Sequence, residues 1–424
     1  MYSGLKYRGL CNTFLFRWLK PSFENFYSTN MSVNIEPNVK NDQNDISINN
    51  KRQLNDENDE IAAKMMKTED GQRIKKKHYA ILMGYLGKGY FGMQRNPGMK
   101  TIEDDFANAL HKANLINAES LENMRNIKFQ RAARTDKGVS AARQIVNLRL
   151  PEEATKESIN QHLPNEIRIF GLKRVTKGFN SKNQCDARTY KYVIPTYAFA
   201  PEEPSFFEET NEEIPKEERF KQRLEQLQTI DGKPFDSFRI TPEIQNKVNS
   251  ITKALTGTHN FHNYTSKTKP LDPRAKRYIM DFSCNETFIA NGREFAVFEV
   301  KGQSFMLHQI RKMVSIVVGI TRNIATEDII NETFKHEKYI VPTAPSLGLF
   351  LEYVHYSYYN KRYGSDGMHE ALSWDECEDE VNQFRKDFIL NHILDTEIAE
   401  NTTLEWLASI DNRHLLLREE VYGE

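Results

Sequence analysis

Short segments in which apolar and polar residues alternate constrain the fold of this chain more than any other feature. Residues 78–85 (HYAILMGY), 144–150, 190–194 and 294–302 (EFAVFEVKG) follow a period of two, which predicts half-buried β-strands, and 347–354 (LGLFLEYV) predicts a fifth strand. Residues 102–115 and 306–320 instead have the spacing of helices that bury one face. Because these elements follow no regular β–α–β order, the pattern predicts an α+β fold with a mixed, mostly antiparallel sheet flanked by helices. The apolar residues that define the two helices are Ile102, Phe106 and Leu110 behind the candidate N-cap Thr101, and Leu307, Ile310, Val314 and Val317.

Composition divides the 424 residues into five predicted segments. Residues 78–200 and 236–357 contain the strands and helices and form two lobes, which an acidic insertion at 201–235 joins. Residues 358–424 form an acidic extension with helical stretches. Residues 1–77 are rich in polar and charged side chains and are expected to form a disordered tail with basic clusters.

The tail carries two candidate targeting signals. Residues 1–30 contain four basic residues and no acid before Glu24, which is typical of a mitochondrial presequence, and Met31 offers a second start without it. The pairing of Lys51-Arg52 with the basic cluster 75–77 has the form of a split nuclear import signal. We therefore expect the nucleus, the mitochondrion or both, with merely solvated charge as the alternative. No membrane association is expected, because the longest apolar run, near Met313–Ile320, is too short to span a bilayer.

The net charge of −1 conceals an uneven distribution. Residues 201–218 contain eight Glu and one Lys, and residues 365–424 contain 16 acidic and four basic residues. The remainder is therefore basic, which favours a polyanionic partner such as nucleic acid. Basic stretches at 168–191 and 266–277 lie among aromatic residues, the combination expected when cations bind phosphates and rings stack on unpaired RNA bases.

Cysteine and histidine spacing gives no metal site. The four cysteines are scattered without a C-x-x-C pair, which excludes a zinc ribbon and does not suggest a disulfide framework. His259 and His262 are three residues apart, but no further ligands stand at suitable spacing. We interpret these two histidines as structural or RNA-facing and expect no metal.

One acidic residue, Asp136, stands in the cationic stretch FQRAARTDKGVSAARQIVNLRL (129–150). Neighbouring cations predict a depressed pKa and an ionised carboxylate, which suits a nucleophile or a base, whereas a structural ion pair is the alternative. Gly138, two residues later, indicates a tight exposed loop. The cations exceed what one carboxylate requires, and a phosphate backbone alongside would explain the surplus of Arg131, Arg134, Lys137, Arg143 and Arg149.

The stretch GKGYFG (87–92) follows a predicted strand and matches the dinucleotide-binding pattern G-x-G-x-x-G. That motif requires a helix to begin at once, whereas Asn96-Pro97-Gly98 interrupts the chain before the helix predicted from Ile102. A glycine-bent loop beside a site is the favoured interpretation. A nucleotide-dependent oxidoreductase is kept as an alternative.

Five stretches resemble, in order, motifs of the TruA family of tRNA pseudouridine synthases. They are GYFGMQRN (89–96), ARTDKGVSA (133–141), RTYKY (188–192), FMLHQIRKMV (305–314) and LGLFLE (347–352). The similarity extends over roughly residues 78–357 and is strongest to the eukaryotic branch. Ser140 and Met93 depart from bacterial members, which have His and Trp at these positions.

The resemblance implies a two-lobed pseudouridine synthase fold with a central RNA-binding cleft, in which 78–200 and 236–357 are the catalytic lobes. It implies isomerisation of uridine to pseudouridine: the N1–C1′ bond breaks, the base rotates and C5 joins C1′, without a cofactor. By resemblance, Asp136 is the catalytic aspartate, which either attacks C1′ or removes a sugar proton. Four other residues receive substrate-binding roles: Arg311 pairs with the aspartate, Arg134 helps to open the RNA helix and place phosphate, Tyr190 stacks on the flipped base, and Leu349 packs in the pocket floor.

The implied substrate is tRNA, with mRNA and snRNA as further candidates, and a monomer is favoured. A catalytically silent RNA-binding protein is the alternative from a different functional class. The combination of Asp136, Tyr190 and Arg311 argues against it, because binding alone does not require this set.

Overall fold

A nine-stranded sheet organises the residues that this computed structural model describes, which are 75–202, 215–266 and 268–410. The strands run in the order β4-β1-β3-β11-β5-β10-β9-β8, and β2 pairs with β3 beside this path. Every pair is antiparallel except β11 with β3, where Phe350 lies opposite Ser140. The predicted α+β class with a mostly antiparallel sheet is therefore confirmed. The strands are β1 (Lys76–Tyr85), β2 (Gln130–Arg131), β3 (Ser140–Pro151), β4 (Ile167–Arg174), β5 (Ala187–Pro195), β8 (Gly257–Asn260), β9 (Lys276–Ala290), β10 (Arg293–Gly302) and β11 (Leu349–His355), with β6 (Thr229–Ile230) and β7 (Lys233–Pro234) forming a separate hairpin.

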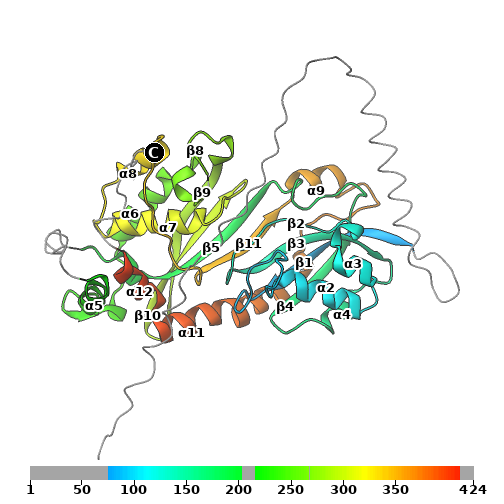
Figure 1. Ribbon diagram of the computed structural model, residues 1–424, viewed down its shortest axis with the longest axis horizontal. Helices are drawn as coiled ribbons and strands as arrows, with labels where there is room; N and C mark the ends of the chain where they lie inside the picture. Colours follow the sequence, from blue (N-terminus) through cyan, green and yellow to red (C-terminus); the bar gives the residue numbers. More distant parts are fainter. Residues whose placement is uncertain (1–74, 203–214, 267, 411–424) are drawn as a thin grey trace, which may run out of the picture. The chain divides into compact units, whose positions relative to one another are not determined.

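Helices flank both ends of this sheet (Figure 1). Those that lie beside β1 and β4 are α2 (Ile102–Lys112), α3 (Ala118–Glu122) and α4 (Lys156–Asn160), and those beside β8, β9 and β10 are α6 (Pro242–Ala254), α7 (Gln309–Thr321) and α8 (Ile329–Phe334). The remaining helices are α5 (Lys216–Gln226), α9 (Ser357–Tyr363), α10 (Glu378–Phe384), the π-helical turn η8 (Arg385–Leu390), α11 (Asn391–Glu400) and α12 (Thr402–Ser409). Single 3-10 turns are η1 (Met124–Ile127), η2 (Thr196–Phe199), η4 (Phe235–Ser237), η5 (His262–Tyr264), η6 (Pro273–Ala275) and η7 (Asp375–Cys377).

The two predicted helices form, but with different boundaries. α2 begins behind Thr101, whose side chain accepts a hydrogen bond from the backbone amide of Asp104, as the predicted N-cap requires. α7 begins only at Gln309, so Leu307 precedes the helix and is 43% exposed. The prediction that Leu307 belongs to the buried stripe is wrong, because the chain turns at His308 before the helical repeat starts.

The predicted half-burial of the first two strands is wrong. Ala80 to Tyr85 are buried without interruption, and so are Ser140 to Leu148. The face of these strands that was expected to be exposed to solvent is covered by a segment that is remote in sequence. α10 packs on β3, and η8 packs on both β1 and β3. The cover is close enough that a Cβ atom on Gly84 would lie 3.0 Å from the ring of Phe384.

The last strand in sequence lies near the centre of the sheet. β11 separates β3 from β5, although β3 and β5 both belong to the segment 78–200. The two predicted lobes therefore share one continuous sheet, and the loop before β3 lies at the seam between them. This position decides where the site residues meet.

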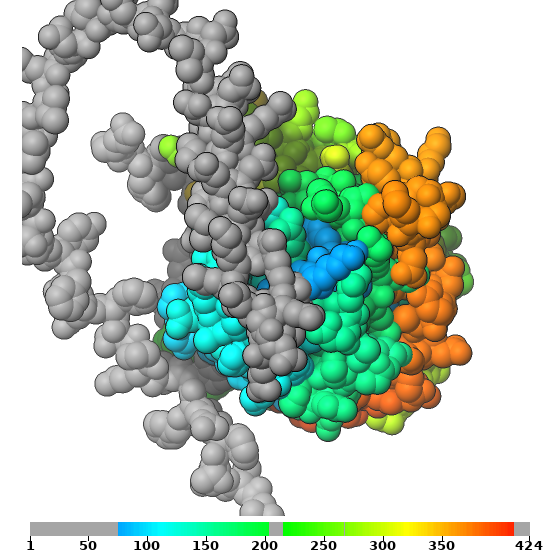
Figure 2. All heavy atoms as spheres, turned by 90° about the vertical axis from the view of Figure 1, so that its right-hand side faces the viewer, coloured from blue at the N-terminus to red at the C-terminus, as the bar shows by residue number. Residues whose placement is uncertain are grey.

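The C-terminal segment is joined to the centre of the sheet by buried ion pairs. Glu352 on β11 is 8% exposed and accepts hydrogen bonds from Arg143 at 2.9 Å and from Arg385 at 2.5 Å. Arg143 also donates to both carboxylate oxygens of Glu378 at 2.8 Å. Figure 2 shows the orange atoms of this segment packed beside the green atoms of residues earlier in the chain. These contacts fix the extension as part of the folded body.

The acidic insertion contributes an internal charge rather than a purely solvated surface. Glu202 is buried and pairs with both Arg322 and Arg223. Arg223 lies on α5, which packs against α12 of the C-terminal segment. The acid-rich residues 203–214 and the tail residues 1–74 lie outside the described residues. The prediction that the disordered tail extends to residue 77 is wrong, because Lys76 and Lys77 of the basic cluster pair with β3 as the start of β1.

Candidate active site

The loop that carries Asp136 connects β2 to β3, and the buried side-chain amide of Gln144 holds it in position. Gln144 is 0% exposed; its Oε1 accepts from the Ala133 amide at 3.1 Å, and its Nε2 donates to the Ala133 carbonyl at 2.9 Å. One residue before the aspartate, the Thr135 hydroxyl is 2.8 Å from the hydroxyl of fully buried Tyr85. The loop therefore has its position set by strands β1 and β3.

The glycine-rich loop is shaped by close contact with this aspartate loop. A Cβ atom on Gly87 would lie 2.5 Å from the Val139 carbonyl oxygen, which no real side chain could tolerate. The Gly87 amide donates to the Ser140 hydroxyl at 2.9 Å. The next helix begins only at Ile102, so no helix N-terminus is available for a pyrophosphate. Gly87 serves the close packing of the two loops, and the late start of α2 removes the basis for the oxidoreductase alternative.

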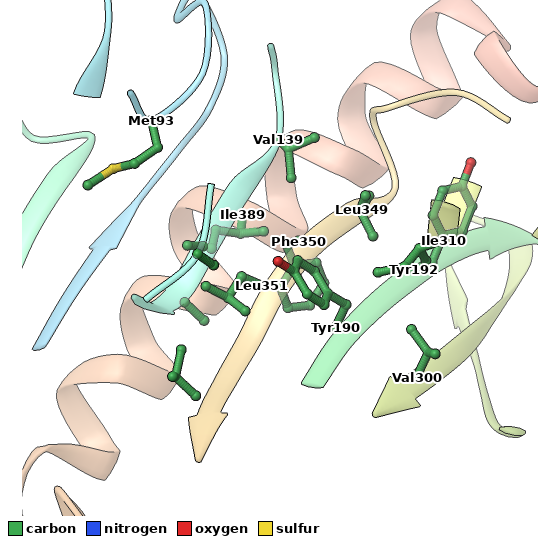
Figure 3. Packing of buried hydrophobic residues seen from close by; sticks show 14 of the residues in the cluster. Met93, Val139, Tyr190, Tyr192, Val300, Ile310, Leu349, Phe350, Leu351 and Ile389 are labelled. Carbon is green, nitrogen blue, oxygen red and sulfur yellow. The ribbon is translucent and has the colours of Figure 1, made fainter. Parts of the chain in front are cut away.

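Asp136 opens into a cavity of about 740 Å³. Three other residues singled out in the sequence line the same cavity: Arg134 is exposed, whereas Tyr190 and Leu349 are each 7% exposed. Figure 3 shows Tyr190 of β5 beside Leu349 and Leu351 of the adjacent strand β11. The Tyr190 ring also contacts Phe305 edge-on, with the ring centroids 5.3 Å apart. The structure thus brings these four residues to one site.

The electrostatic prediction for Asp136 is wrong in sign. Burial raises the pKa of the Asp136 carboxyl above its usual value, although His308 and Arg311 act in the opposite direction. The burial effect was invisible in the sequence, where only the neighbouring cations could be counted. The carboxylate is partly shielded from water, with 30% of its side chain exposed. A more basic carboxylate is better suited to accept a proton.

Arg311 lies on the first turn of α7 but does not form the direct pair that was expected. Its Nε donates to the Ala344 carbonyl at 2.6 Å, and its charge lowers the pKa of Asp136 through space. The contact of Asp136 with an ionisable group within the described residues is to His308, whose Nε2 lies 3.9 Å from Oδ2; it becomes an ion pair only when the imidazole is protonated. The His308 backbone amide also lowers the pKa of the carboxyl by hydrogen bonding. His308 was missed as a candidate although it lies inside the stretch 305–314.

Two of the five cations in the sequence stretch around Asp136 pair with carboxylates of other segments. Arg131 pairs with Glu103, and Arg143 pairs with Glu352 and Glu378. The surplus of positive charge inferred for the aspartate is therefore smaller than the sequence suggested, because carboxylates from remote segments neutralise part of it. Arg134 remains exposed at the cavity.

Cations from other segments replace that surplus at the cavity. Lys182, Arg188, Arg274 and Arg277 line it together with Arg134. Arg188 holds the surrounding loops together, because its guanidinium donates to the carbonyls of Ala132 at 2.7 Å and Gln303 at 2.6 Å. The basic stretches 168–191 and 266–277 contained the signal for these residues, but the sequence could not show that they converge.

The histidine pair offers no metal site. The His262 Nε2 atom lies 3.1 Å from the Glu337 carbonyl, and His259 stacks on Phe334 with ring centroids 4.1 Å apart. No cluster of three or more potential metal ligands occurs in the part of the chain that the structure describes. Nor does any helix there combine the length and the apolar character that crossing a membrane requires.

Comparison with known proteins shows the same relationship as the motifs. The model of a family described as tRNA pseudouridine synthase matches residues 251–357. A pseudouridylate synthase 1 homolog of Mus musculus is 45% identical, over 81% of this chain and 75% of its own length. The chain belongs to the tRNA pseudouridine synthase family.

Further members of the tRNA pseudouridine synthase family give the same result. A pseudouridylate synthase 1 homolog of Homo sapiens is 47% identical, over 78% of this chain and 72% of its own length. The tRNA pseudouridine synthase 1 of Yarrowia lipolytica is 32% identical, over 81% of this chain and 75% of its own length. The resemblance to the eukaryotic branch is confirmed, and the chain is a pseudouridine synthase, an isomerase.

Proposed function

We propose that this pseudouridine synthase isomerises uridines of tRNA, with Asp136 as the catalytic carboxylate. The main support for this proposal is that Asp136 borders a cavity of about 740 Å³, which is within the range of about 300–1,000 Å³ typical of small-molecule sites. The loop beneath the aspartate is fixed by Gln144 and Tyr85, so the carboxylate is held before substrate arrives. The related fungal enzyme's name, tRNA pseudouridine synthase 1, supports tRNA as the substrate.

In this proposal, Asp136 acts on the ribose of a uridine that has left the RNA stack. It attacks C1′ with displacement of the base, or it removes a sugar proton so that the N1–C1′ bond breaks. Both routes need the ionised carboxylate. The His308 amide and the Arg311 charge favour that form, whereas burial makes the carboxylate more basic. The freed base then rotates and C5 bonds to C1′.

Three other residues hold the nucleoside in this scheme. Extrusion of a base costs a few kcal/mol, and stacking against an aromatic ring returns about 1–3 kcal/mol. Tyr190 borders the cavity from β5 and is assigned to this contact, with Leu349 as the adjacent floor. Arg134, exposed at the cavity, is assigned to phosphate and to opening the RNA helix. Arg311 is assigned to orienting Asp136, since the Ala344 carbonyl holds its guanidinium.

The cations around the cavity match the needs of a bound polynucleotide. Lys182, Arg274 and Arg277 come from two separate segments and line the cavity with Arg134. Partial burial lowers the pKa of Arg277, whose side chain lines the cavity that a phosphate would approach. The proposal extends to mRNA and snRNA as further substrates, and a monomer is proposed as the active form.

The remaining assignments concern regions at or beyond the described residues. We propose that residues 1–30 direct one form to the mitochondrion and that a form starting at Met31 enters the nucleus. The segments 78–200 and 236–357 are proposed as catalytic lobes, between the insertion 201–235 and the extension 358–424. Fluorescent fusions of the full chain and of the chain from Met31 test the first proposal; identical distributions would refute it.

Pseudouridine mapping tests the catalytic assignment. Total RNA from cells that carry either the wild-type chain or Asp136→Ala is mapped at single-nucleotide resolution, and RNA affinity is measured on the purified proteins. We expect every site that depends on this chain to be lost in the variant, with RNA affinity retained within about threefold. Sites that persist in the variant would contradict the role of Asp136, and an absence of dependent sites in wild-type cells would favour the silent binding protein.

A further inference from the structure

The reaction includes a proton transfer at the base, whereas Asp136 is assigned to the sugar. When C5 has bonded to C1′, C5 still carries its hydrogen. The electron pair of that C5–H bond must restore the C5–C6 double bond, the proton must go to a base, and N1 must gain a proton. Each atom and electron is accounted for without a cofactor. Asp136 acts on the sugar in either route, so a second group is needed near the base.

We propose that His308 is a second catalytic residue, which accepts the C5 proton on Nε2 and returns a proton to N1. This inference rests on the proposed isomerisation of uridine. The ring lies at the same cavity as the carboxylate, with 31% of its side chain exposed. Among the described residues, no hydrogen-bond partner occupies either ring nitrogen; the nearest charged oxygen is that of Asp136 at 3.9 Å.

The other titratable side chains that line the cavity are excluded by their chemistry. Six are Arg or Lys, which are protonated at neutral pH and cannot accept a proton. Burial raises the pKa of Tyr190 well above its usual value, so its phenol keeps its proton. His308 and Asp136 remain as the lining groups that exchange a proton near neutral pH.

The separation between the two groups leaves each of them free to contact substrate. At 3.9 Å, Nε2 and Oδ2 are too far apart for a direct hydrogen bond. The two groups are nevertheless close enough to reach different atoms of one nucleoside, with Asp136 at the sugar and His308 at the base.

Backbone geometry fixes the ring in this place. His308 adopts a left-handed conformation, with φ of 62°, immediately before α7, and its side chain does not cap the helix. This conformation is uncommon for a residue with a side chain and costs about 1 kcal/mol. It turns the His308 amide to the Asp136 carboxyl while the ring stays at the cavity.

The charges that face His308 favour its neutral form. Burial, Arg311 and Lys312 lower the pKa of His308, and Asp136 acts in the opposite direction; the net direction is downward. The imidazole is therefore unprotonated at neutral pH and able to accept a proton. Once it has done so, the adjacent carboxylate stabilises the imidazolium.

The test separates deprotonation from the earlier steps. The variant is His308→Asn, because Asn tolerates the left-handed conformation that Ala or Gln would strain. Two substrates are used in single turnover: RNA with tritium at uridine C5, and RNA with 5-fluorouridine, which has no C5 proton to lose. Tritium release should fall about 100-fold or more in the variant, in line with loss of a general base. Formation of the carbon-linked fluorinated nucleoside, followed by mass spectrometry, should stay within about threefold of wild type.

Every other result overturns the inference. Unchanged tritium release means that His308 accepts no proton, and an equal loss on both substrates means that it only positions Asp136. Asp136→Asn serves as the reference, because it should abolish both products; if it does not, the proposed function itself fails, whatever His308 does. Equal melting temperatures and RNA affinities of wild type and His308→Asn exclude misfolding. The wild-type rate of tritium release should also decline as pH falls through the lowered pKa of His308, whereas in His308→Asn the only decline should be the one that protonation of Asp136 causes.

Discussion

Replacement of Gln144 by Met should lower both the stability of the fold and the catalytic rate, because the buried side-chain amide of Gln144 holds the aspartate loop in position. The change keeps the side-chain volume but removes the bonds to the Ala133 amide and carbonyl, at 3.1 and 2.9 Å. Ala133 is 6% exposed, so water cannot replace both bonds. Two unpaired backbone groups at about 1–3 kcal/mol each give an expected loss of roughly 3 kcal/mol in the free energy of unfolding.

A loss of this size should be visible as a fall of roughly 5 °C in melting temperature for a body of this size. The catalytic effect should be larger than the stability effect suggests. A displacement of Asp136 by about 1 Å from its productive position is enough for about a 100-fold fall in kcat. Thermal melting and single-turnover pseudouridine formation, measured at a temperature where the variant is fully folded, give the two numbers.

Asn147→Leu is the matched control on the same strand. Asn147 is 1% exposed; its Nδ2 lies 2.9 Å from His78 Nε2 and donates to the Lys128 carbonyl at 3.1 Å, and its Oδ1 accepts from the Ser181 amide at 2.7 Å. Its loss should cost similar stability but leave kcat within about twofold, because none of these three bonds supports the aspartate loop. The reasoning is refuted if Gln144→Met keeps the wild-type kcat, or if both variants lose activity equally.

Three further substitutions test other contacts. Gly87→Ala should reduce activity about 100-fold, because the new Cβ atom would lie 2.5 Å from the aspartate loop. In the control Gly89→Ala the Cβ atom would meet nothing within 4 Å, so this variant should lose only about 1 kcal/mol of stability. Equal activities of the two variants in single-turnover assays would contradict this. Glu352→Gln should cost about 3 kcal/mol in denaturant unfolding, because Arg385 loses its buried carboxylate while Arg143 keeps its pair with Glu378. Glu380→Gln, at a pair whose carboxylate side is 53% exposed, should cost less than about 1 kcal/mol. Similar losses in the two variants would contradict the weight given to the buried network. Asp136→Asn should raise the melting temperature at neutral pH, because a raised pKa of the carboxyl in the folded state means that its ionised form destabilises the fold. The gain should vanish as pH falls below about 3.8, where the wild-type carboxyl is protonated in both the folded and the unfolded state. A lower melting temperature of the variant at pH 7 would contradict the sign of this effect.

Local features of the structure were predictable from the sequence, because they depend on residues close together in the chain. The Thr101 cap of α2 and the strand character of 294–302 follow from side chains within a few positions of each other. The same holds for the interruption that separates the glycine-rich loop from α2. The order of the motifs also identified residues that meet at the cavity, because members of one family share a fold and place matching motifs at the same site.

Features that depend on remote segments were not predictable. The polar residues of β1 and β3 suggested solvent on one face, but α10 and η8 cover that face from more than two hundred positions away in the sequence. The cations near Asp136 suggested a depressed pKa, but burial outweighs them, and Glu103 and Glu352 take up Arg131 and Arg143. Spacing and charge counts contain no information on which distant segment will cover a strand.

The dependence of the site on remote segments has a consequence for folding. Asp136 lies just before β3, yet β3 pairs with β11, and Arg143 on β3 bonds to Glu352 on β11, 209 positions further along the chain. The Asp136 carboxyl also needs the start of α7, where His308 and Arg311 lie. The aspartate loop can therefore reach its final position only after the later segments have docked on the first strands, and closing such long loops is slow. The Asp136 carboxyl lies beside His308 and is partly shielded from water only after these later segments have docked. It therefore becomes able to act as a catalyst at the same folding step that completes the sheet.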